Sequence, residues 1–93
     1  MGLFSRTPTR VYLVEDDSDR DNAPYTRYWA HVYLSLDKAK AGVETYAERG
    51  GHGPVRWVDR GGVHYAYPAG DDAAAELYKV VPLGVRTDDQ PEP

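Results

Sequence analysis

The stretch from residue 28 to 49 (YWAHVYLSLDKAKAGVETYAER) constrains the fold most, because a strand pattern in it runs directly into a helix pattern. Its first part alternates two sets of side chains, Tyr28, Ala30, Val32 and Leu34 on one side and Trp29, His31 and Tyr33 on the other. A period of two is typical of a β-strand. We therefore expect a strand over about residues 29–34.

The second part of the stretch has the features of an amphipathic helix. Ser35 offers a hydroxyl to the free backbone N–H groups of a helix start, and Asp37 lies where the helix dipole favours a carboxylate. Apolar side chains then recur at helical spacing, at Leu36, Ala39, Val43 and Tyr46. Gly50 and Gly51 favour the left-handed backbone that ends helices, so a helix of about 14 residues is expected to stop there.

The remaining segments predict strands separated by turns. Short β-branched and aromatic runs occupy residues 10–14 (RVYLV), 55–59 (VRWVD) and 63–67 (VHYAY). Arg60, Gly61 and Gly62 favour a tight hairpin between the last two runs. Residues 73–81 are ambiguous between helix and strand, and we prefer a strand from about Glu76 to Val81 because Pro82 cannot continue a helix.

This order of elements predicts a single α+β domain over residues 10–85. One helix on one face of a mainly antiparallel sheet of about five strands is the simplest two-layer solution for the order strand, strand, helix, strand, strand, strand. Residues 1–9 are expected to form an N-terminal arm, residues 15–24 an exposed acidic loop, and residues 86–93 a disordered acidic tail.

Composition excludes several classes of protein and site. The chain has no cysteine, which removes disulfides and thiolate zinc sites. Its formal charge of −4 would repel a nucleic acid, so no nucleic-acid partner is expected. No apolar run has the length of a signal peptide or a membrane span. We expect a soluble cytoplasmic protein without a membrane partner.

No catalytic or metal-binding motif is apparent. The histidines His31, His52 and His64 do not have the spacing of a helical metal pair or of a zinc motif. None of the serines lies in a glycine-flanked nucleophile elbow. The sequence therefore predicts a noncatalytic protein with no metal and no cofactor.

A coverage argument predicts where the aromatic side chains lie. A helix of about 14 residues is about 21 Å long and 10 Å wide, whereas five strands span about 20 Å. One helix therefore leaves one sheet face uncovered. If Trp29, His31 and Tyr33 lie opposite the helix, they form an aromatic patch of the residue types enriched in interaction hot spots. The alternative is an ordinary hydrated tyrosine surface without a partner.

The phrases RVYLVEDD, HVYLSLDKAKAGVETY and ELYKVVPLGV resemble small uncharacterised proteins of actinobacteria and their phages. The resemblance covers about residues 10–84. It implies a first strand, a second strand leading into a Ser/Asp-started helix, a hairpin and a terminal strand. It implies no catalytic or binding residues.

These observations predict an accessory or regulatory protein-interaction module, and the resemblance implies that it is encoded by an actinobacterium or one of its phages. The expected contact surfaces for a protein partner or for self-association are the aromatic side of Trp29, His31 and Tyr33, a sheet edge, or the acidic loop with Asp16, Asp17 and Asp19. One alternative is a small-ligand binder or minor enzyme with a site near His31 and His64, or between helix and sheet. Another is an acidic mimic of nucleic acid.

Overall fold

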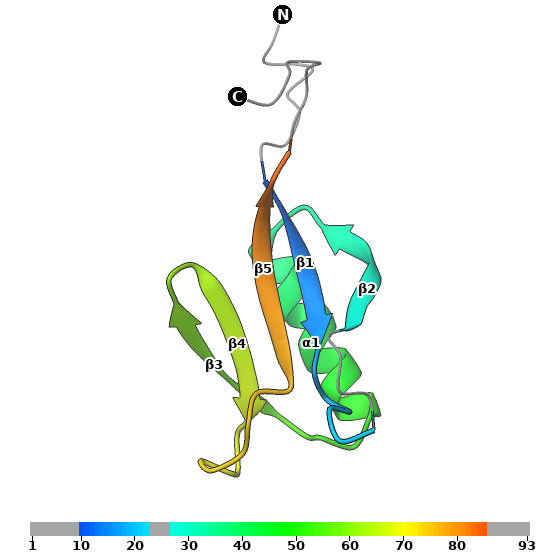
Figure 1. Ribbon diagram of the computed structural model, residues 1–93, viewed down its shortest axis with the longest axis vertical. Helices are drawn as coiled ribbons and strands as arrows, with labels where there is room; N and C mark the ends of the chain where they lie inside the picture. Colours follow the sequence, from blue (N-terminus) through cyan, green and yellow to red (C-terminus); the bar gives the residue numbers. More distant parts are fainter. Residues whose placement is uncertain (1–9, 23–26, 86–93) are drawn as a thin grey trace, which may run out of the picture.

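A computed structural model describes residues 10–22 and 27–85, and shows one antiparallel sheet with one helix across part of a face (Figure 1). The elements are β1 Arg10–Asp16, β2 Arg27–Tyr33, α1 Leu36–Arg49, β3 Val55–Arg60, β4 Val63–Pro68 and β5 Tyr78–Gly84. The strand order is β2-β1-β5-β4-β3. The α+β fold and the predicted order of elements are confirmed. The predicted arm (1–9) and tail (86–93) lie outside the described residues.

The helix begins and ends at the predicted residues. Ser35 has an extended backbone, and its hydroxyl accepts a hydrogen bond of 3.1 Å from the backbone N–H of Lys38. At the other end, the N–H of Gly50 donates to the carbonyl of Tyr46 at 2.9 Å, and Gly51 has a φ of 82°. The two caps satisfy backbone groups that a helix end would otherwise leave unpaired.

The first and last strands along the chain, β1 and β5, have other boundaries than predicted. β1 extends through Glu15 and Asp16, which pair with Lys79 and Tyr78 of β5, so only residues from 17 onward leave the sheet. β5 starts at Tyr78 and runs through Pro82 to Gly84. Residues 73–77 form no helix.

Local features explain the turn between β4 and β5, the place of Pro82 in β5 and the turn between β3 and β4. The backbone N–H of Ala73 donates to the Asp71 carboxylate at 3.0 Å, which favours a turn over a helix start. Pro82 is tolerated because β4 pairs with β5 only as far as Val80, so that no described strand pairs with this side of β5 at residue 82. The β3–β4 hairpin turns at Gly61 and Gly62, with φ values of 59° and 86°, as the sequence predicts.

The core lies between α1 and the central strands. Its buried members are Val14, Ala39, Val43, Ala47, Ala66, Tyr78 and Val80. Two of the three buried helix residues are alanines, so the helix backbone approaches the sheet closely. α1 packs on β1, β2 and β5. The β3–β4 hairpin extends beyond it, and is tied to the helix by Trp57, whose Nε1 donates to Glu44 at 2.9 Å.

Within the described ranges, no helix has the length and apolarity needed to cross a membrane.

Candidate functional site: an aromatic groove between β2 and α1

The side chains of Trp29, His31 and Tyr33 lie on the helix side of β2. The ring centroid of Trp29 is 5.0 Å from that of Tyr46 on the helix and 6.2 Å from that of the buried Tyr78. The expectation that these three residues lie opposite the helix is therefore wrong. Both sides of β2 carry apolar groups, so its alternation did not show which side meets the helix. In the structure, the side with the larger rings meets the helix.

Other side chains of the sheet lie on the face opposite α1. Among the described residues, no helix covers the sheet face opposite α1. The side chains on that face, which alternate with those of the core, are those of Val11, Leu13, Glu15, Tyr28, Val32, Tyr65, Tyr67, Lys79, Val81 and Leu83. Near the ends of β3 and β4 this face is a tyrosine and cation surface. The guanidinium of Arg56 lies 4.9 Å from the Tyr67 ring centroid, and that of Arg60 lies 5.1 Å from Tyr65. Such contacts leave the tyrosine rings covered by cations of the same chain.

Between β2 and α1 lies a groove of about 520 Å³. Its lining residues are Trp29, Ala30, His31, Tyr33, Ala41, Gly42, Thr45, Tyr46 and Arg49. Along the helix it runs from residue 41 to residue 49, a length of about 12 Å at 1.5 Å per residue. We call this feature the aromatic groove. It brings together all three aromatic-side residues that the sequence selected.

A glycine in the middle of the helix makes room for one wall of the aromatic groove. A Cβ added to Gly42 would lie 2.8 Å from Cζ of Tyr33 and closer still to its hydroxyl oxygen. Tyr33 Oη also lies 3.1 Å from Nε2 of His31, within hydrogen-bond distance. The helix and β2 therefore hold the Tyr33 phenol at the groove with its polar end near an imidazole.

A second hollow of about 380 Å³ adjoins the aromatic groove, because both are lined by Tyr46 and Arg49. The remaining residues around it are Asp16, Ser18, Arg27, Gly50, His52 and Tyr78. Burial raises the pKa of the Tyr78 phenol, so this side chain stays neutral over the physiological range. The second hollow therefore has two guanidinium groups and one carboxylate around a neutral phenol.

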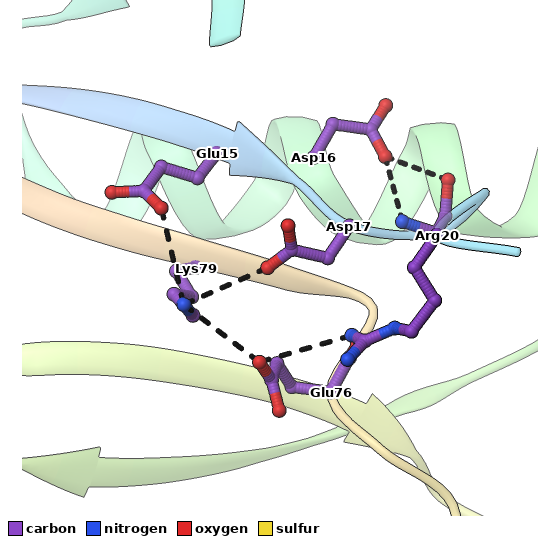
Figure 2. Close-up of polar contacts among 7 residues, drawn as sticks. Glu15, Asp16, Asp17, Arg20, Glu76 and Lys79 are labelled. Atoms are coloured by element: carbon purple, nitrogen blue, oxygen red, sulfur yellow. Dashed lines mark hydrogen bonds and ion pairs between the residues drawn. The ribbon is translucent and has the colours of Figure 1, made fainter. Parts of the chain in front are cut away.

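The acidic segment is held by contacts within the chain (Figure 2). The Asp16 carboxylate accepts hydrogen bonds from the Ser18 N–H at 3.0 Å and from its hydroxyl at 2.6 Å. Asp17 lies 3.7 Å from Nζ of Lys79, and Asp19 accepts a hydrogen bond of 2.8 Å from the Asn22 amide. All three carboxylates that were predicted to meet a partner therefore already contact groups of the same chain.

Lys79 is the centre of that network. Its ammonium group lies 3.9 Å from Glu15, 3.7 Å from Asp17 and 3.7 Å from Glu76. Burial lowers the pKa of Lys79, but the three carboxylates together outweigh burial, and the pKa is raised. Arg20 also contacts Glu76, donating to its backbone carbonyl and lying 3.8 Å from its carboxylate. No sequence pattern predicted this cluster, because Lys79 is distant from the acidic run along the chain.

The histidine pair considered from the sequence does not form. β1 and β5 lie between β2, which carries His31, and β4, which carries His64. Three strand spacings separate the two strands, about 14 Å. His64 instead lies opposite Asp59 in the β3–β4 hairpin. Within residues 10–22 and 27–85, no three His, Asp or Glu side chains converge as a metal site.

Sequence reasoning missed the helix wall of the aromatic groove. Gly42, Thr45, Tyr46 and Arg49 recur three or four apart, which is the spacing of one helix stripe. Their stripe adjoins the buried one, so the spacing was present in the sequence. The sequence did not show, however, which side of β2 this helix stripe faces.

Comparison with known proteins finds no matching family model, no matching curated protein and no matching solved structure. The resemblance to actinobacterial and phage proteins stays a prediction. We therefore infer function from the geometry of the aromatic groove and of the hollow beside it.

Proposed function

We propose that this chain is a small, noncatalytic protein-interaction module of the cytoplasm, and that a protein partner inserts a side chain into the aromatic groove. The observation that carries the proposal is the grouping of Trp29, His31, Tyr33 and Tyr46 around one groove. Tyrosine and tryptophan combine a large apolar surface with a polar tip, and both are enriched at interaction hot spots.

The position of β2 supports binding of an extended segment. β2 is an edge strand of the sheet, so one side of its backbone has no neighbouring strand among the described residues. A partner strand added there would place alternate side chains beside Trp29, His31 and Tyr33, which all lie on one side of β2. The 12 Å length of the groove corresponds to about three to four extended residues.

The lining residues of the aromatic groove suit the binding of an apolar side chain, because most of its wall is made of aromatic rings and small side chains. The described lining of the aromatic groove contains no carboxylate, lysine or serine, and its imidazole lies within hydrogen-bond distance of Tyr33. Recognition of an apolar side chain requires only the rings and the polar rim.

A matched pair of substitutions tests the proposal. Ala41 lines the aromatic groove and is exposed, whereas Ala69 is exposed in a turn after β4. Twelve-residue peptides selected from a random display library on the wild-type protein would be measured against Ala41→Trp and Ala69→Trp. We expect Ala41→Trp to weaken the selected peptides at least about tenfold by filling the groove, about 1.4 kcal/mol. Ala69→Trp should leave their affinity unchanged. Failure to select any peptide, or equal affinity for both variants, would reject the proposal.

A second candidate is a small-ligand binder. The volume of about 520 Å³ lies within the range of about 300–1,000 Å³ that is typical of ligand pockets. Of the two places predicted for such a site, the space between helix and sheet contains the groove, whereas His31 and His64 do not meet. It would be favoured if a small aromatic compound bound in the groove and no peptide did.

A further inference from the structure

We infer that the partner segment is acidic: an extended peptide in which a ring-bearing side chain enters the aromatic groove and a neighbouring carboxylate meets Arg27 and Arg49. This inference rests on the proposed function and names the chemistry of its ligand. The polar feature that carries it is the pair of guanidinium groups of Arg27 and Arg49 around the second hollow, of which Arg49 also lines the aromatic groove.

The aromatic groove and the second hollow are lined by more positive than negative side chains, whereas the whole chain is negative. The protein has a formal charge of −4, yet the charged residues that line the two hollows are Arg27, Arg49 and Asp16. Asp16 already accepts two hydrogen bonds from Ser18. Within the described residues, neither arginine forms an ion pair. Asp16 lies opposite Arg27 in the β1–β2 pairing but forms no ion pair with it. Both guanidinium groups can therefore still donate to a carboxylate from outside, which arginine binds through two parallel N–H donors.

The chain directions place Arg49, with Arg27 beside it in the second hollow, at one end of the aromatic groove, and Tyr33 with Gly42 at the other end. β2 runs from Arg27 to Tyr33, and α1 returns so that Gly42 lies against Tyr33 while Arg49 and Arg27 line the same hollow. Arg27 is two residues before Trp29 on the same side of the strand, about 7 Å away. A ligand carboxylate at the arginines would thus be one or two residues from the side chain that enters beside Trp29.

A short anionic group fits this end better than a nucleic-acid strand does. Two arginines neutralise one or two charges, and the neighbouring acidic segment, with Asp16, Asp17 and Asp19, would repel a chain of phosphates. An acidic peptide can place one carboxylate at the arginines and turn its neutral residues toward the acidic segment. A mononucleotide, with one ring and one phosphate, has similar chemistry and is included in the test.

The test uses defined probes and the full chain. Three blocked nine-residue peptides have a central phenylalanine flanked by glutamates, by glutamines or by lysines, and a fourth has alanine at the centre between glutamates. Adenosine monophosphate is a fifth probe. Binding is followed by two-dimensional amide NMR of the wild type, of Arg49→Gln, and of Arg56→Gln, whose guanidinium lies on the opposite sheet face.

The inference predicts that the glutamate peptide binds most tightly and shifts amides of β2 and of the end of α1. Arg49→Gln should weaken binding of the glutamate peptide by about two- to fivefold, the range for an exposed charge pair, without changing the affinity of the glutamine peptide. Arg56→Gln should change neither. The alanine peptide should bind at least about tenfold more weakly, because it lacks a ring.

Other outcomes separate the two proposals. Equal binding of the glutamine and glutamate peptides in the groove would overturn the acidic preference and leave the interaction module standing. Tighter binding of adenosine monophosphate than of every peptide would overturn it in favour of a nucleotide. Groove shifts with none of the peptides, in a protein whose amide spectrum shows that it is folded, would overturn both proposals.

Discussion

Tyr33 and Gly42 are packed so closely that position 42 has no room for a side chain. A Cβ there would lie 2.8 Å from Cζ of Tyr33. Glycine within a helix costs about 1 kcal/mol relative to alanine. Glycine occurs at the point where the Tyr33 phenol packs against the helix, and its missing side chain allows the phenol to line the aromatic groove.

Gly42→Ala should therefore act differently in two backgrounds. In the wild type, the added methyl should displace the Tyr33 ring and separate it from His31, so that the helix-propensity gain is largely offset. In a Tyr33→Ala background, the same change should stabilise the protein by about 1 kcal/mol. Urea unfolding of the four proteins measures this double-mutant cycle. An equal effect of Gly42→Ala in both backgrounds would show that the two residues are not coupled.

Trp57 and Glu44 connect the β3–β4 hairpin to the helix. Removal of the indole N–H in Trp57→Phe, or of the acceptor in Glu44→Ala, should each destabilise the protein, and their coupling should be about 0.5–1 kcal/mol. Glu44→Gln keeps an acceptor oxygen and is the control, with a smaller effect. Denaturant unfolding gives these values, and a coupling energy of zero would mean that the 2.9 Å contact contributes nothing to stability.

Lys79→Met should destabilise the protein at neutral pH and much less in acid. The substitution leaves Glu15, Asp17 and Glu76 close together without their shared cation. We expect a loss of about 1 kcal/mol at pH 7, which shrinks near pH 3 because most carboxylates are then protonated. Lys38→Met, at an exposed helix position, is the matched control. A loss that does not change between pH 7 and pH 3 would contradict the network.

Stability should fall in alkaline solution through two neighbouring groups. The pKa values of Tyr78 and of Lys79 are both raised in the folded protein. A raised folded-state pKa gives a contribution that is complete below the unfolded value, about 10 for tyrosine and 10.4 for lysine, and is lost as the pH rises through the folded value. The free energy of unfolding should therefore decrease above about pH 10.

Tyr78→Phe separates the tyrosine part of this effect. It should make the decrease above about pH 10 less steep, because the buried position then has no group to ionise. Tyr28→Phe, at a residue that is 58% exposed, is the control. Thermal unfolding followed by circular dichroism between pH 8 and 11 is the measurement. An identical slope in Tyr78→Phe and the wild type would show that Tyr78 does not contribute.

Local interactions explain why the sequence by itself determined the order of elements and most of their boundaries. Ser35 and Gly50 act on backbone groups within one helical turn, and Gly61 and Gly62 need only their own backbone angles to form the hairpin. Such signals do not depend on distant residues. They led to the α+β class, to the helix boundaries and to the β3–β4 hairpin.

Boundaries that depend on distant partners were less well predicted. Glu15 and Asp16 join β1 because they pair with Lys79 and Tyr78, although their composition is that of a loop. The strand order likewise separates His31 from His64, since two strands come between them. Pairing energies between segments far apart in the chain decided these points.

The location of the candidate site was decided by tertiary structure alone. Alternation divided β2 into a side with Trp29 and Tyr33 and a side with Tyr28 and Val32, and both sides are apolar. Only packing selected between them: the larger rings meet the helix, where Gly42 leaves room for Tyr33. The aromatic residues named from the sequence consequently line a groove beneath the helix edge, whereas the uncovered face of the sheet contains other side chains.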